Sequence, residues 1–356
     1  NKTLSIIGGY TGTTPEPGGM VSNPAATVVD AQQNGRVMYI VTANNVVLSN
    51  LTFSGGNDSP GLGLNINNSS VRAVDCAIQD NKKTSAGVKG GGLYVNGGTS
   101  VFERCSFLRN TIVDNSWQAN YGGAVYHNAG ALELRSCVLA GNRVNEEGNN
   151  NYGHGGAVYA GSAGRLRLYN CLIRDNFVGG TQSTYSEAIT CADAVGPVSI
   201  ENCTVVANFP RGINRRAAGT VSITNSIVWN NGDDDLVGAI NLSYSSVGDT
   251  NTGTGVIHSD PQFAQGYYLA DGSPCTNAGS DSAVNIGLAG LYAQTNTSDA
   301  LQVDLGYHHL PALSVTNIYV SPSGVDATGT GAAAAPYRSV TKALAMASEH
   351  ARINIE

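Results

Sequence analysis

Short segments in which apolar and polar residues alternate recur through most of the chain. They read VRAV shortly before Cys76, LELR before Cys137 and VSIE before Cys203. A period of two predicts a strand with one buried face and one solvated face. The pattern therefore predicts many short strands, and no long helix.

A seven-residue segment with one fixed register recurs six times. The six copies read DCAIQDN, RCSFLRN, SCVLAGN, NCLIRDN, NCTVVAN and NSIVWNN, and begin at Asp75, Arg104, Ser136, Asn170, Asn202 and Asn225. The small second residues of successive copies are 29, 32, 34, 32 and 23 residues apart. Fixed inward positions with connections of variable length are typical of stacked coils that expel insertions as loops.

A third element precedes each alternating strand. It reads GGLYV at Gly91 and GGAVY at Gly122 and Gly155, followed by EAITC at Glu187 and RGINR at Arg211. Three short strands per coil predict an all-β fold, a right-handed single-stranded parallel β-helix of the pectate-lyase-like kind, with a short capping helix in the C-terminal segment.

Stacked coils place equivalent side chains above one another and so predict two columns. The inward column consists of Cys76, Cys105, Cys137, Cys171, Cys203 and Ser226. The turn column consists of Asn81, Asn110, Asn142, Asn176, Asn208 and Asn231, where Asn is expected to adopt left-handed backbone and to bond to the next coil. We expect the thiols to be buried and unreactive. Disulfides between neighbouring coils and metal binding are the alternatives. Side chains in register on parallel strands seldom offer the dihedral angle of a disulfide. Ligands in a line do not form the tetrahedron that zinc prefers.

Composition agrees with short strands and tight turns, because the 356 residues include 45 Gly and only 13% are charged. The net charge is −7, and no cluster of Lys or Arg extends beyond a pair such as Arg215 and Arg216, so neither nucleic acid nor an anionic membrane is an expected partner. No apolar run approaches the roughly 18 residues that span a bilayer.

The first residues lack the features of a signal peptide, so we expect either a removed signal or a piece of a longer chain. We expect no cofactor and no metal.

After Asn231 the repeat loosens, and three other blocks follow. They are DPQF at Asp260, YYLADGSPCTNAGSD at Tyr267 and VDLGYHH at Val303. These blocks resemble the closing segment of bacterial secreted and surface β-helix proteins of the choice-of-anchor Q, or polymorphic outer-membrane-protein-like, families. The resemblance implies an extracellular or cell-surface location and an adhesive or structural role, and it carries no catalytic residue across.

The chain is expected to divide into a β-helix with its closing segment, residues 1–310, and a segment of linker, strand and capping helix, residues 311–356. The second segment looks like the beginning of another β-helix unit. Ser339 is placed to cap a helix. The residues expected to join this segment to a neighbouring unit are Val340, Ala343, Leu344, Ala347, Ile353 and Ile355. The expected partners are further copies of the unit, end to end, in a covalent array or a non-covalent fibre.

Loops that follow successive coils at one corner are the candidate interaction surface. They carry Trp117, Tyr121, Tyr152, His154 and Tyr185. Aromatic rings among amides can bind sugars; the alternative is that these rings only pack their own loops. Glycans or a host or cell surface are therefore further possible partners.

A second constellation bears on catalysis. Glu187 and Arg211 lie on adjacent coils with Asp193, Arg215 and Arg216 nearby, which approaches the set that a polysaccharide lyase would need, although a surface ion pair is the simpler interpretation. The run Asp233–Asp235 is interpreted as a solvated turn, with calcium binding as the alternative.

The expected function is a non-catalytic extracellular structural or adhesive module; the alternative is a carbohydrate-binding or carbohydrate-cleaving β-helix.

Overall fold

The computed structural model describes two compact units, Asn1–His309 and Leu310–Glu356. The described residues are 3–9, 23–85, 87–114, 119–146, 153–161, 164–179, 186–192, 196–216, 219–295, 297–311, 317–330, 332–346 and 352–355. Each unit is considered by itself. Among these residues the structure is mostly parallel β-sheet with two short α-helices, which confirms the all-β class.

The largest sheet of the first unit has 14 strands and two arms that share three long strands. The shared strands, each of 11 residues, are β6 (Leu64–Val74), β9 (Leu93–Glu103) and β13 (Val125–Arg135). One arm continues through β3 (Met38–Val41), β17 (Val158–Ala160), β21 (Ile189–Cys191), β24 (Arg211–Arg215) and β27 (Asp234–Val237). The other continues through β1 (Leu4–Ile7), β4 (Val46–Ser49), β18 (Arg165–Tyr169), β22 (Val198–Glu201), β25 (Val221–Thr224) and β28 (Asn241–Ser243).

The second sheet has nine strands, one from each successive repeat. They are β2 (Val28–Asp30), β5 (Thr52–Ser54), β7 (Ala77–Gln79), β10 (Ser106–Leu108), β14 (Val138–Ala140), β19 (Leu172–Arg174), β23 (Thr204–Val206), β26 (Ile227–Trp229) and β29 (Ser246–Val247). Four of the connections that leave the second sheet each begin with a short strand, and these strands form a four-stranded sheet. They are β8 (Lys82–Thr84), β11 (Thr111–Asp114), β15 (Arg143–Glu146) and β20 (Phe177–Val178). A two-stranded sheet joins β12 (Asn120–Tyr121) to β16 (Gly153–His154).

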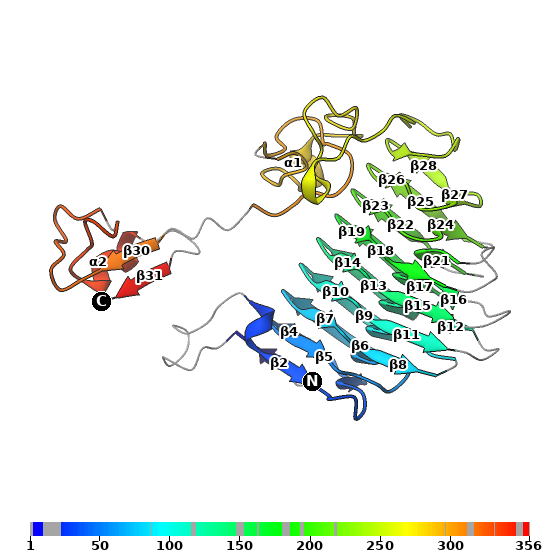
Figure 1. The fold of residues 1–356 in the computed structure, drawn as a ribbon, viewed down its shortest axis with the longest axis horizontal. Coiled ribbons are helices and arrows are strands. Elements are labelled where there is room, and N and C mark those ends of the chain that lie inside the picture. Colours follow the sequence, from blue (N-terminus) through cyan, green and yellow to red (C-terminus); the bar gives the residue numbers. More distant parts are fainter. Residues whose placement is uncertain are drawn as a thin grey trace. The chain divides into compact units, whose positions relative to one another are not determined.

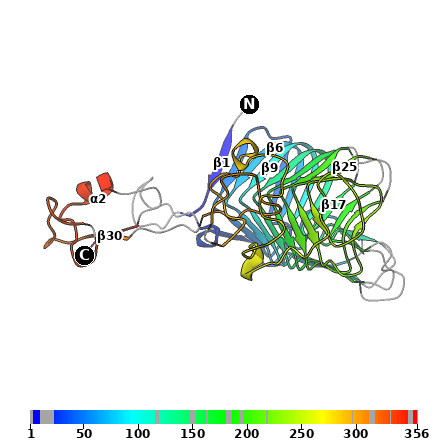
Figure 2. The same ribbon diagram turned by 90° about the horizontal axis from the view of Figure 1, so that it is seen from above.

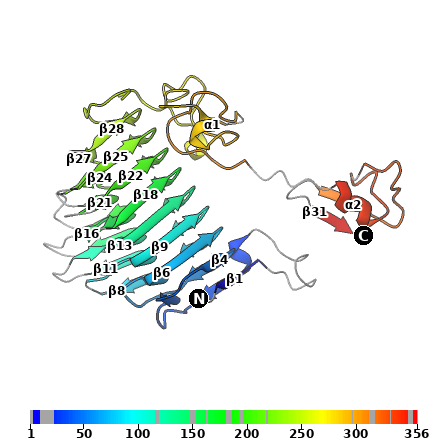
Figure 3. The same ribbon diagram turned by 180° about the vertical axis from the view of Figure 1, so that it is seen from behind.

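Every pair of named strands in these sheets is parallel, and each repeat is in register with the next. Phe107, for example, pairs with Ile78 on one side and with Leu139 on the other. We call one such layer of strands a rung; the rungs follow one another in chain order from blue to green (Figures 1 and 3). Figure 2 shows the same unit from above.

The core of the first unit lies between the sheets and is one continuous cluster from Ile40 to Val247. It forms because the alternating strands direct Leu, Ile, Val and Phe to the same side in every rung. Phe53, Phe102 and Phe107 are its largest fully buried side chains. Burial of an apolar side chain of this size contributes roughly 2–3 kcal/mol, so the core is built rung by rung.

Glycine lies just before the first strand of several rungs because the next rung approaches closely there. A Cβ atom at Gly91 would lie 2.2 Å from the Gly123 carbonyl oxygen, and one at Gly123 would lie 2.3 Å from that of Gly156. No other residue fits such a contact without a shift of the backbone.

Two corners in each repeat have left-handed backbone, and neither falls on the Asn column. The residues before the small column, namely Asp75, Arg104, Ser136, Asn170, Asn202 and Asn225, have φ between 50° and 52°. The residues before the Asn column, namely Asp80, Arg109, Asp175, Ala207 and Asn230, have φ between 53° and 56°, and Gly141 has φ of 65°. The prediction of left-handed backbone at the column Asn residues themselves is wrong: the bend is made one residue earlier, so that the Asn side chain turns inward.

The closing segment, residues 260–309, packs along the flank of the rungs. It contains the short helix α1 (Ala283–Ile286), and its apolar residues Leu269, Cys275 and Leu305 pack against Ile227 of β26. Within the segment, the fully buried His308 contacts the Asp299 carboxylate at 2.8 Å.

Two asparagines attach the closing segment to the rungs in the same way. The Asn170 amide accepts from the backbone N–H of His308 at 2.7 Å and donates to its carbonyl at 3.0 Å. The Asn225 amide accepts from the backbone N–H of Ser280 at 2.8 Å and donates to its hydroxyl at 3.0 Å. Both asparagines are corner residues before the small column, so this corner forms a docking strip.

The second unit contains β30 (Asn317–Val320), the helix α2 (Val340–Met346) and β31 (Arg352–Ile355). The two strands are parallel, with Ile318 opposite Ile353. Its small core consists of Ile318, Val320, Tyr337 and Ala343. The Ser339 hydroxyl accepts from the backbone N–H of Lys342 at 3.1 Å, so Ser339 caps α2 as the sequence predicts.

Candidate functional site

The Asn column is a continuous chain of buried hydrogen bonds. Each side-chain amide donates to the side-chain oxygen of the Asn in the next rung, at 2.8–2.9 Å for all five steps from Asn81 to Asn231. The same amide also donates to a backbone carbonyl of the preceding rung, as Asn142 does to Phe107 at 2.9 Å. The column thus satisfies polar groups at a corner that is closed to water.

The column ends on an acid that the sequence analysis assigned to a solvated turn. Asp235 is buried, and its carboxylate accepts from the Asn231 amide at 2.8 Å and from the backbone N–H of Gly248 at 2.9 Å. Burial raises the pKa of this carboxyl group. The solvated-turn interpretation is wrong for Asp235, because the side chain replaces the next Asn of the column. Asp234 instead pairs with Arg211 at 2.7 Å.

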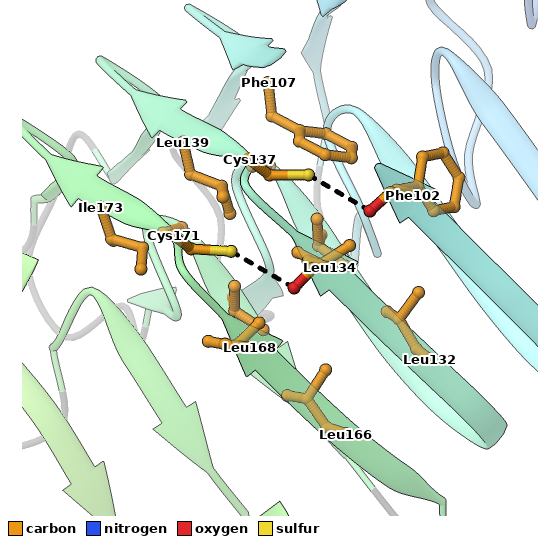
Figure 4. Close-up of a cluster of buried hydrophobic side chains, with 14 of the residues drawn as sticks. Phe102, Phe107, Leu132, Leu134, Cys137, Leu139, Leu166, Leu168, Cys171 and Ile173 are labelled. Atoms are coloured by element: carbon orange, nitrogen blue, oxygen red, sulfur yellow. Dashed lines mark hydrogen bonds between the residues drawn. The ribbon is translucent and has the colours of Figure 1, made fainter. Parts of the chain in front are cut away.

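The small column is equally regular and lies inside the core (Figure 4). The thiols of Cys105, Cys137, Cys171 and Cys203 each contact a backbone carbonyl of the preceding rung; Cys137 contacts that of Phe102 at 3.4 Å and Cys171 that of Leu134 at 3.3 Å. The backbone N–H of Cys203 donates to the Ser226 hydroxyl at 3.1 Å, and that of Ser226 donates to the Ser245 hydroxyl at 3.1 Å. The column therefore continues to Ser245. The seven-residue motif is no longer recognisable there, so the sequence did not predict this member.

All seven cysteines are buried and free. Burial raises the pKa of Cys137 and Cys203, and it raises the pKa of Cys191 to about 12. A buried neutral thiol is a poor nucleophile. The column therefore packs the core, which confirms the expectation of buried, unreactive thiols.

Two of the five candidate loop residues lie in the described part of the chain, and they contact each other. The rings of Tyr121 and His154 stack with centroids 5.4 Å apart, because β12 and β16 pair in register. Trp117, Tyr152 and Tyr185 lie outside the described residues. The Tyr121 ring also contacts Tyr159 at 4.7 Å.

A column of tyrosines that the sequence analysis did not single out lies beside this pair. Tyr94, Tyr126 and Tyr159 occupy the same outward position of successive rungs, and their rings stack with centroids 5.4 and 5.0 Å apart. The repeated Tyr of GGLYV and GGAVY was the available signal. Because the ring faces cover one another, the column is mostly self-packed.

Thr190 follows Tyr159 in the register of this column, and its neighbour Glu187 is fully buried. Its carboxylate accepts from the Thr190 hydroxyl at 2.5 Å and from the Asn214 amide at 3.4 Å. Burial raises the pKa of Glu187 to about 7. The interpretation of Glu187 and Arg211 as a surface ion pair is wrong, since Arg211 pairs with Asp234 and Glu187 exposes no surface.

Arg216 links this acid to the loop aromatics. Its guanidinium lies 3.2 Å from Nε2 of His154, and its positive charge acts on Glu187. The structure therefore joins the two candidate constellations into one cluster. Asp193 lies outside the described residues, and Arg215 instead donates to the Gly219 carbonyl at 2.8 Å.

The residues expected to join units are divided between buried and exposed positions. Ala343 is fully buried, whereas Val340 is 39% and Ile355 64% exposed. Val340 and Ile355 are therefore accessible, whereas Ala343 belongs to the small core of the second unit. Leu344 and Ile353 lie in α2 and β31 and only their backbone is described; Ala347 lies outside the described residues.

The described residues contain no group of three or more His, Cys, Asp or Glu side chains arranged to hold a metal ion. In that same part of the chain, no helix has the length and apolar character to cross a membrane. Comparisons with protein-family models, with curated proteins and with solved structures found no match.

Proposed function

We propose that residues 4–309 form a right-handed single-stranded parallel β-helix that serves as a non-catalytic structural or adhesive module outside the cell. The support is the rung geometry: three strand columns, an inward Cys and Ser column and a buried Asn column all repeat in register. The extracellular location is supported by the resemblance of the blocks at Asp260, Tyr267 and Val303 to closing segments of secreted β-helix proteins.

In this proposal, neighbouring units join end to end, and the observation that carries it is the open first rung. Among the described residues, β1 pairs only with β4 and β2 pairs only with β5. Leu4, Ile7 and Val28 on these strands are each more than 50% exposed. Unpaired strand edges beside exposed apolar side chains favour the addition of a further strand.

The second unit contains a strand that could pair with such an edge. Its two parallel strands form a sheet that is too small to be stable without further packing, and Ile355 on β31 is exposed. Addition of β31 of one chain to the β1 edge of another would extend both sheets by strand addition. The joint is head-to-tail, so it generates a filament unless the rotation closes.

Light scattering with size-exclusion chromatography, followed by negative-stain microscopy, tests this proposal. The expected result is concentration-dependent linear assembly that is lost in Ile7→Lys. Val284→Lys is the matched control, because Val284 is an exposed apolar residue on α1, away from the first rung. A chain that stays monomeric at every concentration, or assembly that Ile7→Lys leaves intact, contradicts end-to-end joining.

A further inference from the structure

The two strands of the second unit are arranged as two successive rungs of one strand column. β30 and β31 are parallel, and Val320 lies opposite Ile355, which follows it in the chain by about one repeat. Opposed residues of such a pair lie on the same face of the sheet. Val320 is 4% exposed because it packs against Tyr337 and Ala343, whereas Ile355 on the same face is 64% exposed. β31 therefore has an apolar side chain that its own unit leaves largely uncovered.

The first rung lacks cover in the same way on its strand β1. Ile6 lies opposite Leu48 of β4, and Leu4 lies opposite Val46, so both are on the core side of the sheet. Leu48 and Val46 are buried, but Leu4 is 53% exposed and Ile6 is only partly buried. Among the described residues β1 pairs with no strand other than β4. Its other edge therefore has backbone groups and apolar side chains to which a further strand could add.

The last rung is closed by the chain itself, so the two ends of the first unit differ. The Asp249 carboxylate accepts from the backbone N–H groups of Asp235 and Leu236 of β27, at 2.9 and 2.7 Å. Residues 254–257 form bridges to β28 and β29. A second copy is therefore expected to add a strand at the first rung and not at the last.

One alignment of β31 on β1 makes an inward column continuous across the joint. With Ile355 opposite Ile6, this column consists of Val320, Ile355, Ile6 and Leu48. A shift by one residue would turn Ile355 toward the outer face. A shift by two residues would set Ile355 either against Gly8, which has no side chain, or against Leu4, which leaves Ile6 uncovered.

We propose that β31 of one copy of this chain pairs in parallel with β1 of a second copy, with Ile355 opposite Ile6. β30 and β31 then become two further strands of the largest sheet of the second copy, because they extend its parallel ladder in the same register. The inference rests on the end-to-end joining proposed above and specifies the geometry of the joint.

Spin-label distances between copies test this geometry on the full chain. Under the proposed alignment, Tyr319 of β30 lies in one outward column with Arg72 of β6 and Ser222 of β25. Chains labelled at Tyr319→Cys are mixed with chains labelled at Arg72→Cys or at Ser222→Cys, since the native thiols are buried. We expect about 19 Å, or four strand spacings, between the labels at positions 319 and 72, and about 24 Å more between those at 319 and 222.

Assembly of substituted chains, measured by light scattering, is the second readout. Ile355→Asp should abolish concentration-dependent assembly, because it places a charge in the inward column, and Ile355→Val should retain it. Val325→Asp is the matched control, since Val325 is a 50% exposed apolar residue of the same unit and lies outside its strands. It should assemble as the unchanged protein does.

The outcomes separate this geometry from end-to-end joining itself. Assembly that shows both distances and is lost in Ile355→Asp alone supports the alignment. Assembly that survives Ile355→Asp, that is lost equally in Val325→Asp, or whose two distances do not differ by about 24 Å overturns the alignment and leaves the joining of units standing. A chain that stays monomeric at every concentration overturns both.

Discussion

The Asn231 amide donates to the Asp235 carboxylate at 2.8 Å, so the buried Asn column ends on an acid from the following strand. The same carboxylate oxygen accepts from the backbone N–H of Asn231 at 2.9 Å. Asp235 therefore occupies the position that an Asn of a further rung would take. A column of this kind needs an acceptor at its last step, and a carboxylate supplies acceptors alone.

Removing one member from the middle of the column should destabilise the first unit strongly. Asn142→Ala removes the donors to Phe107 and Asn176 and leaves the Asn110 amide without its acceptor. We expect a loss of roughly 3–4 kcal/mol in the free energy of unfolding, measured by urea denaturation. The exposed Asn241→Ala should change it by less than about 0.5 kcal/mol. Similar losses in the two variants would mean that the column does not stabilise the fold.

The small column should accept a hydroxyl and resist a larger side chain. Ser226 and Ser245 already occupy it, so Cys171→Ser should lower the free energy of unfolding by no more than about 1 kcal/mol. Cys171→Leu adds volume to a packed core and should lower it by about 2 kcal/mol or more. The reverse order of stability, measured by thermal and chemical unfolding, would place the Cys171 side chain outside the core.

Glu187 should make the protein less stable as the pH rises toward neutrality. Its pKa is raised by burial from 4.5 to about 7, so the folded state holds a proton that the unfolded state releases. The contribution is fully present below pH 4.5 and is lost as the pH rises through 7, by about 3 kcal/mol in total. Urea denaturation between pH 4 and 8 measures this decrease.

Glu187→Gln keeps the side chain neutral at every pH and should remove that decrease. Glu201→Gln, which changes a half-buried carboxylate in the Arg167 ion pair, is the control and should retain it. A pH profile that is the same with Gln at position 187 would show that Glu187 is ionised in the folded protein.

The closing segment should come loose when its docking strip is broken. Asn225→Ala removes both side-chain hydrogen bonds to Ser280. We expect limited proteolysis to cleave within residues 260–309 at least tenfold faster, which corresponds to about 1.4 kcal/mol of lost local stability. Asn230→Ala, at an exposed corner, is the control. Equal cleavage rates would mean that the Asn225 side chain does not hold the segment in place.

The repeat was sufficient to predict the strands, both columns and the buried thiols, because these features depend on one register that recurs in the sequence. It misplaced the left-handed corner by one residue, since Asp80 and Asn81 are both types that tolerate positive φ and only the inward direction of Asn81 distinguishes them. Ser245 and Asp235 were missed because the last rungs no longer repeat the motif.

The docking strip had no signal in the sequence. Asn170 and His308 are 138 residues apart, and nothing periodic connects them. Asn170, Asn202 and Asn225 look alike in sequence, yet the first and third hold the closing segment and the second has an unpaired side-chain nitrogen. Such differences arise only when the closing segment packs against the rungs.

The account depends on equivalent residues of successive repeats lying one strand spacing apart. Spin labels on Asp80→Cys and Asn230→Cys, five strands apart in the second sheet, measure this directly by electron paramagnetic resonance, because the seven native thiols are buried. The account predicts a distance near 24 Å between the two positions, and a distance about 10 Å shorter for the pair Asp80→Cys and Asp175→Cys. Distances that do not increase with the number of intervening strands would contradict it.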